Sequence, residues 1–499
     1  MNNRIAKNTL YLYLRMLFSM GITFYTTRVV LATLGFDDFG IYNVVGSVLA
    51  MFAVLKASMS TSTSRFLTFA LGREDKEEFR KTFSAALTIH VLIAFLFLVL
   101  AETAGLWYLE NIMEIPPDRM NAARAVYQLS IVSAMVTIIQ VPYNAAIISH
   151  ERMNIYAYIE ILNVCLKLGI VYLLSIGHWD QLIFYAVLML LVSCLITGVY
   201  RLYCVKRFKE CTYKFEWDRK VIYPMLTFSG WDTLGNGAVI GATQGVNLLL
   251  NSFFGILVNT AYGVCYQINN AAINFVRNFQ MAVNPQIVKN YAAGKLDDLR
   301  SLILQNAKIS FVLMWLLFLP ISLNLELILQ FWLGEVPEYA ATFCRLVLIQ
   351  SLISCVQRPF VMTIHATGRM KVFQLTTGTV LLSVLPASWF FLKAGGAPHI
   401  PFLVYIAASA IELCVELYLV GKWIKLSHIS LFKKVFVPIL LIIACTLPVS
   451  ALAAYYLPFL LAVAVSGLSV CVSAFYIAFD KETRSKVLQY AKNILCHTK

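Results

Sequence analysis

A chain of 499 residues with 60% hydrophobic and only 13% charged residues cannot cover a soluble globule with polar surface, and its mean hydropathy is +0.73. We therefore expect an integral membrane protein. The formal net charge of +14 does not indicate nucleic acid as a partner, because the basic residues lie in short connections between apolar spans.

Windows of about 20 apolar residues predict an all-α protein with about 14 transmembrane helices. The predicted spans are 9–33, 40–66, 83–109, 125–148, 158–177, 181–203, 225–252, 259–284, 302–328, 340–364, 372–393, 402–421, 435–456 and 458–479. The first span follows a short basic start and lacks a cleavage site of small residues, so we expect it to be retained.

The basic residues are unevenly divided between the two sides of the predicted membrane. Alternate connections on one side, together with both ends of the chain, hold nearly all the loop Lys and Arg. The connections on the other side hold three, Arg119, Arg124 and Lys393. Because positively charged loops stay in the cytoplasm during insertion, we expect both termini to be cytoplasmic.

An internal repeat organises the chain. Pro142 to Tyr156 matches Pro359 to Phe373 at an offset of 217 (359 − 142), and a shorter match joins Gly72 to Gly294 at an offset of 222 (294 − 72). These matches predict two parallel halves, one about five residues shorter between the two matches. The predicted organisation is an N-terminal six-helix lobe (1–203), a basic cytoplasmic linker (204–224), a C-terminal six-helix lobe (225–421), two additional helices (422–479) and a cytoplasmic amphipathic tail (480–499).

Several basic side chains fall inside predicted spans. A charge near the bilayer centre costs roughly 2.5 to 3.5 kcal/mol on insertion scales, so such residues usually face a wet cavity or a partner. Lys56 lies about 15 Å from the inner end of its predicted helix, Arg277 about 10 Å from the inner face, and Arg28 near the outer third of its span. These three are our candidates for binding a negatively charged substrate. Lys167 is left open, because Glu160 lies two turns away on the same helix.

Two predicted helices carry polar side chains along one face. The spacing of Asp232, Asn236, Asn247 and Asn251 puts them on one face of the seventh helix, and Gln267, Asn270 and Asn274 share a face with Arg277 on the eighth. A face that met lipid would leave these groups unpaired, so we expect them to line a cavity. Hydrogen bonds between helices are the alternative.

Other polar and small residues within spans have two interpretations each. Glu412 and Glu416 lie one turn apart, so they and Asp232 are candidates for coupling to Na⁺ or H⁺; pairing with a basic residue of a neighbouring helix is the alternative. Gly237 and Gly245 belong to a small-residue ridge that predicts close helix packing rather than a bendable gate.

Enzyme and metal-site motifs are missing from the sequence. There is no Walker motif, no cofactor motif and no metal-ligand spacing among the histidines and cysteines. Asp37 and Asp38 lie in the first outer connection, where a membrane glycosyltransferase could keep a catalytic acid, but a short helix-connecting turn explains them better. We therefore expect a transporter without cofactors rather than an enzyme.

Two stretches resemble a known family. The run from His365 to Gln374 resembles the cytoplasmic connection between helices ten and eleven of Wzx-type polysaccharide flippases, exporters of the multidrug/oligosaccharidyl-lipid/polysaccharide (MOP) superfamily. The segment from Asn8 to Tyr42 resembles their first two helices. The resemblance implies two six-helix lobes around a cavity lined by helices one, two, seven and eight, which is cationic in similar flippases. The acidic residues Asp232, Glu412 and Glu416 depart from that pattern.

The resemblance implies a flippase that carries a polyprenyl-diphosphate-linked oligosaccharide across the bacterial cytoplasmic (inner) membrane by alternating access, for surface polysaccharides such as O-antigen, lipopolysaccharide or capsule. Its expected partners are that lipid-linked substrate, the phospholipid bilayer and other polysaccharide-assembly proteins, with no nucleic acid. Alternatives are a multidrug/cation antiporter of the same superfamily, a membrane glycosyltransferase or polymerase, and a non-transporting scaffold.

Overall fold

The computed structural model describes residues 3–50, 53–111, 115–174, 180–215, 217–478 and 484. That part of the chain is helical with short connections and contains no strand. It divides into two compact units, a first unit of Asn3–Thr233 and a second unit that begins at Leu234. The division falls inside one helix, α8 (Arg219–Phe254).

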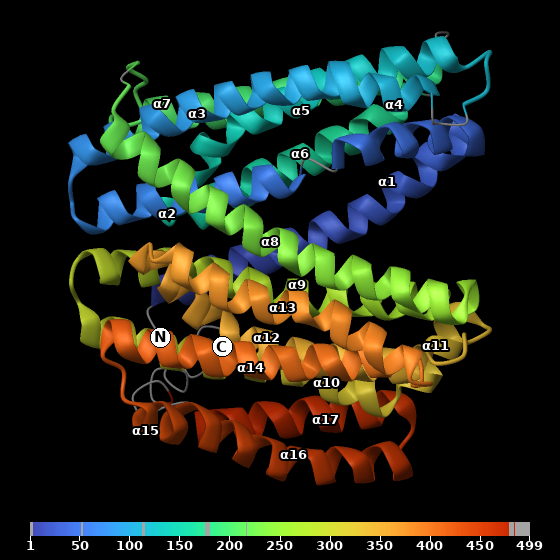
Figure 1. Cartoon of the computed structure of the whole chain (residues 1–499), viewed down its shortest axis with the longest axis vertical. Helices are drawn as coiled ribbons and strands as arrows, with labels where there is room; N and C mark the ends of the chain where they lie inside the picture. Colours follow the sequence, from blue (N-terminus) through green and yellow to red (C-terminus); the bar gives the residue numbers. More distant parts are fainter. Residues whose placement is uncertain are drawn as a thin grey trace, which may run out of the picture. The chain divides into compact units, whose positions relative to one another are not determined.

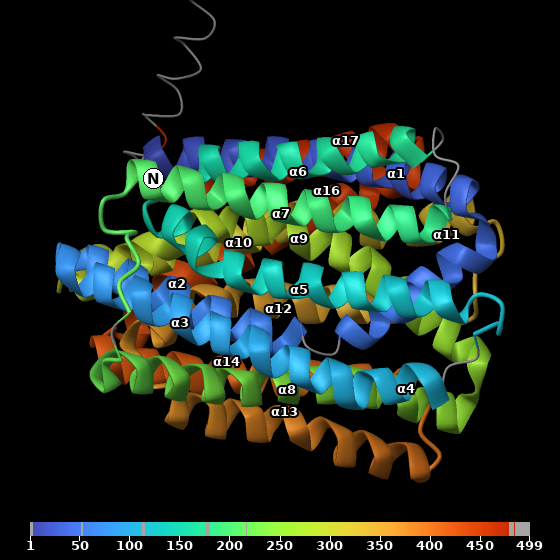
Figure 2. The same cartoon turned by 90° about the horizontal axis from the view of Figure 1, so that it is seen from above.

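The helices of the first unit are α1 (Asn3–Ala50), α2 (Ala53–Gly72), α3 (Lys76–Leu100) with the π-turn η1 (Ala101–Gly105), α4 (Leu106–Asn111), α5 (Met120–Ser149), α6 (Met153–Leu174) and α7 (Gln181–Arg207). α3, η1 and α4 follow one another as a single bent rod (Figure 2). The central helix is α5, which contacts α1, α2, α3, α6 and α7.

The helices of the second unit after α8 are α9 (Ile256–Ala292), α10 (Leu296–Leu323), α11 (Leu325–Leu333), α12 (Ala340–Thr367), α13 (Met370–Lys393), α14 (Ile400–Ile424), α15 (His428–Leu431) with η2 (Phe432–Phe436), α16 (Val437–Tyr456) and α17 (Phe459–Ser473) with η3 (Ala474–Ala478). Its central helix is α12, which contacts α9, α10, α13 and α14 (Figure 1). Each unit is thus built around one long helix.

Wherever the predicted spans lie within the described residues, they fall on helical segments, so the all-α membrane fold is confirmed. Among the described residues, ten helices are long and apolar enough to cross a membrane. α8 and α9, at 36 and 37 residues, are long enough but are not among the ten, because amide and hydroxyl side chains lower their hydropathy.

The helices extend past the apolar windows where a polar turn continues them. α3 begins at Lys76, ahead of the predicted start at 83, because the Asp75 side chain accepts a hydrogen bond from Glu78 N at 2.8 Å. Glu77 and Glu78 also place negative charge in the first turn, where the helix dipole favours it. A search for apolar residues cannot detect such a turn.

The longer repeat is confirmed in the backbone. Pro142 of α5 and Pro359 of α12 are both buried within their helices. Each helix ends near a residue with a left-handed backbone, Glu151 (φ 57) and Gly368 (φ 75), again at an offset of 217 (368 − 151). The two amides donate to carbonyls one turn back, Ile148 O at 2.8 Å and His365 O at 3.1 Å. The two turns are therefore structural equivalents.

The predicted alignment of the shorter match, Gly72 with Gly294, was wrong by two residues. The left-handed turn residues that correspond are Glu74 (φ 59) and Gly294 (φ 70), at an offset of 220 (294 − 74) rather than 222. The next amides repeat the same bond, Asp75 N to Ala70 O at 3.2 Å and Lys295 N to Asn290 O at 2.9 Å. The length difference between the halves in this region is therefore three residues, not five. The turn accepts Glu or Gly, so identical letters misled the alignment.

Small residues of α8 meet α13 closely in the second unit. A Cβ added at Gly245 would collide with the Leu385 side chain, whereas one at Gly237 would meet nothing within 4 Å. Close packing is therefore confirmed at Gly245 but does not explain the whole predicted ridge. Gly235, which lies off that ridge, is in equally close contact with Gln374.

The last helix pair belongs to the second unit. α16 and α17 lie side by side and both contact α10 (Figure 1). A buried hydrogen bond joins α16 to it, from Trp315 Nε1 to Thr446 Oγ1 at 2.9 Å. The predicted domain limits 1–203, 204–224, 225–421 and 422–479 stay predictions, and the tail 480–499 lies outside the described residues apart from Arg484.

Candidate functional site

A polar cavity of about 450 Å³ lies within the first unit, among helices that are otherwise apolar. Its lining comes from four helices and consists mostly of charged, amide and hydroxyl side chains. These are Lys56 and Ser60 of α2, Thr137, Gln140 and Asn144 of α5, Glu160, Asn163 and Lys167 of α6, and Ser193 of α7. A cavity with this lining can hold water and a polar ligand at membrane depth.

The charges of this cavity are close but not paired. The electrostatic field of Glu160 acts on Lys56, yet within the described chain neither Lys56 nor Lys167 forms an ion pair within 4 Å. Glu160 instead accepts a hydrogen bond from Tyr200 Oη at 3.0 Å. Gln140 Oε1 is held by Thr197 Oγ1 at 3.1 Å. The cavity therefore keeps two ammonium groups that a negatively charged ligand could approach.

One face of α9 presents the predicted polar stripe. Gln267, Asn270, Asn274 and Arg277 are all exposed. The opposite face, with Cys265, Ala272 and Val276, is buried. Within the described chain, the side chains of Gln267, Asn270 and Asn274 form no hydrogen bond. An amide face without partners is costly against lipid, so this face requires contact with water or a ligand.

Other amides of α9 form the hydrogen bonds that join helices. Asn269 Oδ1 accepts from Ser351 Oγ at 2.6 Å. Gln280 Nε2 donates to Ser310 Oγ at 3.0 Å and to Cys355 O at 3.2 Å. All five of these residues are buried on the packed side of the helix. Hydrogen bonding between helices thus accounts for the buried amides but not for the exposed stripe.

The polar residues of α8 are less uniform. Asn251 is exposed, while Asn247 has a buried Oδ1 for which the described chain supplies no hydrogen-bond donor. Asp232, only 4% exposed, and Asn236 both have interaction partners. α8 therefore does not present one continuous open face, and its residues remain candidates individually.

Two arginines and two glutamates lie near one another in the second unit. The charge of Arg358 of α12 acts both on Arg277 of α9 and on Glu416 of α14. Glu412 and Glu416 are buried, and within the described chain neither forms an ion pair within 4 Å. Glu416 Oε2 also lacks a hydrogen-bond donor there. The pairing with a neighbouring basic helix residue is thus electrostatic rather than a direct contact.

The remaining candidate residues are placed as follows. The side chain of Arg28 lies outside the described residues, as does that of Asp37. Asp38 accepts from Arg119 Nε at 2.9 Å, and Arg119 also bridges to Asp180 at 2.6 Å. Because Asp38 is fixed by this ion pair, its position is explained without a catalytic role.

A family model described as "Polysaccharide biosynthesis protein" matches residues 5–290, more than half of the chain. The chain belongs to the polysaccharide biosynthesis protein family. A second model, MatE, matches residues 243–390. Both point to membrane transporters of the MOP superfamily and not to enzymes.

The sequence relative described next matches only part of the chain, whereas the two solved structures match most of it in fold at low sequence identity. The "Uncharacterized membrane protein EpsK" of Bacillus subtilis (strain 168) is 24% identical over 158 residues, which span 32% of this chain and 31% of that protein. A structure titled "Outward-facing conformation of a multidrug resistance MATE family transporter of the MOP superfamily" matches with a TM-score of 0.72 at 12% identity, covering 84% of this chain and 96% of that one. A MOP superfamily transporter from Pyrococcus furiosus, described by its "reverse polarity of binding pocket", matches with a TM-score of 0.69 at 14% identity, covering 86% and 96%.

The sequence pattern did not reveal most of the cavity lining in this member of the polysaccharide biosynthesis protein family. Thr137, Gln140 and Asn144 are spaced i, i+3, i+7 on α5, and Glu160, Asn163 and Lys167 are spaced identically on α6. The spacing that identifies the stripe on α9 is present in both sets. Each set is short and lies in an otherwise apolar span, so it carries a weaker signal than the amide-rich α9.

Proposed function

We propose that the protein is a flippase that moves a polyprenyl-diphosphate-linked oligosaccharide across the bacterial cytoplasmic membrane. The observation that carries the proposal is the open face of α9, where three unpartnered amides adjoin Arg277. Amides suit sugar hydroxyls, because they both donate and accept hydrogen bonds. A guanidinium suits diphosphate oxygens.

The internal repeat places a second basic residue, Lys56 of the first half, at a position close to that of Arg277 in the second half. Arg277 follows Lys56 at an offset of 221 (277 − 56), one more than the offset of 220 (294 − 74) between structurally equivalent turns. Each half thus offers one positive group at nearly the same level of equivalent helices, with amides nearby. Lys56 and Arg277 are therefore proposed ligands of the diphosphate, and Arg28, whose side chain lies outside the described residues, is proposed as a third from its depth in the first predicted span.

The polar residues of α8 and α9 are the proposed contacts for the sugar, separate from the lining of the cavity around Lys56: Asp232, Asn236, Asn247, Asn251, Gln267, Asn270 and Asn274. Alternating access of the two lobes would carry the head group while the polyprenyl tail stays in lipid. Outward movement of each negative charge gains about 2.3 kcal/mol per 100 mV of membrane potential. That gain supplies part of the driving force without a nucleotide.

Export by single variants tests this function. A strain that lacks the gene is complemented with Lys56→Ala, Arg277→Ala or Arg28→Ala, and surface polysaccharide and lipid-linked intermediate are measured at equal membrane abundance. We expect at least about tenfold less export and accumulation of the intermediate, whereas Lys56→Arg retains export because the charge remains. Lys371→Ala, which removes an exposed charge at a helix end, is the matched control. Undiminished export in all three alanine variants overturns the proposal.

Buried carboxylates favour a second candidate function for the protein. In this function, export is coupled to the entry of a cation, as in an antiporter of the same superfamily. Glu412 and Glu416 lie buried one turn apart, and Asp232 is buried as well. A carboxylate pair of this kind binds a proton or Na⁺ readily. Glu416→Gln should then abolish the dependence of transport on a Na⁺ or pH gradient. Efflux of cationic dyes by wild type, with lipid-linked export unaffected by deletion, would favour the antiporter.

A further inference from the structure

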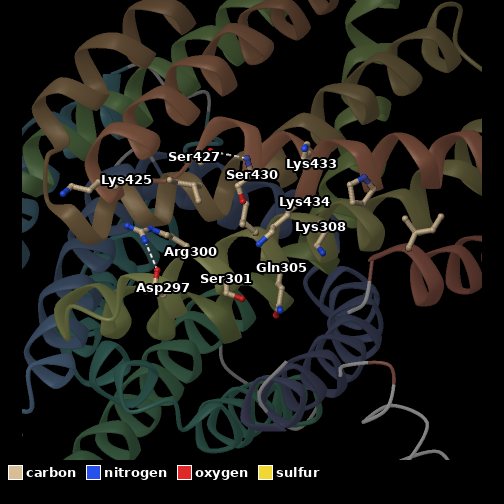
Figure 3. Close-up of a pocket in the computed structure, with 14 residues that line it drawn as sticks. Asp297, Arg300, Ser301, Gln305, Lys308, Lys425, Ser427, Ser430, Lys433 and Lys434 are labelled. Carbon is tan, nitrogen blue, oxygen red and sulfur yellow. Dashed lines mark hydrogen bonds and ion pairs between the residues drawn. The ribbon is translucent and has the colours of Figure 1, made fainter. Parts of the chain in front are cut away.

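A second cavity, of about 560 Å³, lies in the second unit between α10 and the segment that joins α14 to α16, and none of the candidate residues discussed above lines it (Figure 3). α10 forms one wall with Arg300, Ser301, Gln305 and Lys308. The other wall is the connection from α14 through α15 and η2 to α16, with Lys425, Ser427, Ser430, Lys433 and Lys434. Five basic residues and one acidic residue, Asp297, leave a net charge of four positive units.

Two of the basic residues hold the walls in place. Arg300 donates from Nε and Nη2 to Ile424 O at 2.9 and 2.7 Å, which ties α10 to the end of α14. Its Nη1 donates to Asp297 Oδ1 at 2.7 Å. Lys308, 8% exposed, donates from Nζ to Ala478 O at 3.0 Å at the end of η3. These bonds join three separate elements around the cavity.

The other three basic residues are available to a ligand. Lys425, Lys433 and Lys434 are exposed, and within the described chain none of them forms an ion pair or a side-chain hydrogen bond. Three ammonium groups around one cavity repel one another unless an anion lies between them. Hydroxyl groups of Ser301, Ser427 and Ser430 line the same cavity and can donate to anionic oxygens (Figure 3).

Apolar residues complete the lining of the cavity. Leu304, Pro438 and Ile477 line it together with the charged residues. Close by in the chain, Ile429 and Phe432 are exposed on the short α15–η2 segment, next to Lys433. Exposed apolar side chains adjoining lysines are typical of a segment at the level of lipid head groups. A ligand that suits this cavity therefore combines an anionic head with an apolar tail.

We propose that this cavity binds the phosphate-ester head group of a membrane lipid at the end of the second unit predicted to face the cytoplasm. Lys425, Lys433 and Lys434 contact the phosphate oxygens, and the serines donate to them. Arg300 and Lys308 are positioning residues that keep the walls together. The ligand is either an anionic glycerophospholipid or a polyprenyl diphosphate, which present the same phosphate chemistry. The proposal does not depend on transport of either lipid.

Binding in detergent solution tests the site. The full-length protein is titrated at fixed salt with fluorescent short-chain phosphatidylglycerol, with fluorescent farnesyl diphosphate and with a phosphatidylcholine analogue of equal tail length. We expect the first two to bind at least about tenfold more tightly than the third, since each lysine near the head group contributes to attraction of an anion. Inorganic pyrophosphate should compete weakly, because it lacks the tail.

The decisive variant is the triple Lys425→Gln/Lys433→Gln/Lys434→Gln, which spares the two anchoring residues. Its matched control, Lys206→Gln/Arg207→Gln/Lys209→Gln, removes three exposed charges from the first unit on the same predicted side. We expect at least about tenfold weaker binding in the first variant and little change in the control. Loss for farnesyl diphosphate alone identifies the polyprenyl lipid, and loss for both anionic probes identifies a general phospholipid site.

Equal weakening in the control triple overturns the proposal, because attraction to the overall charge would then explain binding. Unchanged affinity in the cavity triple overturns it as well. The triple Lys→Arg variant should bind as wild type does, which separates lost charge from misfolding. Export is measured in the same variants as a separate readout. Full export together with lost lipid binding supports a lipid site that is distinct from the transport path. If the flippase proposal fails, the binding result still decides whether this site exists.

Discussion

Gly35 and Gly255 have the same backbone conformation, with φ 78 and ψ 173 at the first and φ 80 and ψ −170 at the second. Side chains with a Cβ almost never adopt this conformation. Each glycine separates two long helices, α1 being interrupted there and α9 beginning immediately after. Their offset of 220 (255 − 35) equals that between Glu74 and Gly294, so the same hinge between helices recurs in both halves.

We therefore predict that Gly35→Ala and Gly255→Ala each destabilise the protein by about 1 to 3 kcal/mol through backbone strain. Neither added Cβ would meet an atom within 4 Å, so crowding cannot explain a loss. Gly21→Ala and Gly263→Ala are matched controls, because both lie in open space with ordinary helical backbones and should be neutral or slightly stabilising. Thermal stability of the monodisperse protein in detergent measures both pairs. Equal effects at hinge and control positions would contradict the prediction.

The contact of Gly245 with Leu385 predicts a rescue. Gly245→Ala should destabilise by about 1 to 3 kcal/mol, because its new methyl group overlaps the Leu385 side chain. Leu385→Ala removes that side chain, so the double variant should recover part of the loss in a double-mutant cycle. Gly237→Ala, with open space around it, is the control and should not destabilise. A purely additive cycle would show that α8 and α13 do not touch at this point.

Substitutions on the two faces of α9 should separate transport from stability. Asn270→Leu/Asn274→Leu alters the exposed face and should lower export at least about tenfold while leaving thermal stability nearly unchanged. Asn269→Leu breaks the buried hydrogen bond with Ser351 and should cost about 1 to 3 kcal/mol of stability. Higher stability with full export in the Asn270/Asn274 variant would mean that this face meets lipid.

Acid should weaken the ion-pair cluster at the predicted outer end of the first unit. Burial alone would raise the pKa of Asp180, but Arg119 and the backbone amides of Ile183 and Leu182 outweigh it and lower that pKa below the usual 3.8. A lowered folded-state pKa stabilises the protein above pH 3.8, and this contribution disappears as the pH falls through the folded-state value. The partial exposure of the cluster keeps the effect modest.

Asp180→Asn is the variant for this prediction, since asparagine keeps the helix cap on α7 while it removes the charge. The thermal stability of the variant and of the wild type is measured from about pH 3 to 7. Near neutral pH the variant should be less stable than the wild type, and the two stability curves should converge at the acidic end. Parallel curves over the whole range would show that the Arg119 bridge contributes nothing through the ionisation of Asp180.

Much of the fold followed from the sequence because a bilayer requires long apolar helices with satisfied backbones. The match of Pro142 with Pro359 also identified equivalent helices, because the two prolines are buried at the same place in α5 and α12, nine residues before the left-handed residues Glu151 and Gly368. The register between Gly72 and Gly294 failed for the opposite reason. The turn there requires only a left-handed residue, and Glu74 satisfies it in one half while Gly294 satisfies it in the other.

The candidate sites could be predicted from the sequence only where a single helix carries all the polar residues of the site. The stripe of Gln267, Asn270 and Asn274 lies on a single face and was predicted from spacing. The cavity around Lys56 combines short sets from four helices, and no single set distinguishes it from ordinary packing. From the sequence alone, membrane topology explains Lys425, Lys433 and Lys434, because their convergence with α10 depends on how the segment from α14 to α16 folds.

The attachment of α16 and α17 to α10 makes the two halves unequal in mass, although the framework that precedes them is a repeat. If the halves rock during a transport cycle, the last pair travels with the second half as a rigid appendage. A spin label or fluorophore at Tyr455, which is 81% exposed on α16, would therefore report displacement of that half without touching either cavity. Because α16 and α17 are attached to the second half only, a label on them distinguishes the two halves, which a label on either half of a twofold-symmetric transporter would not do.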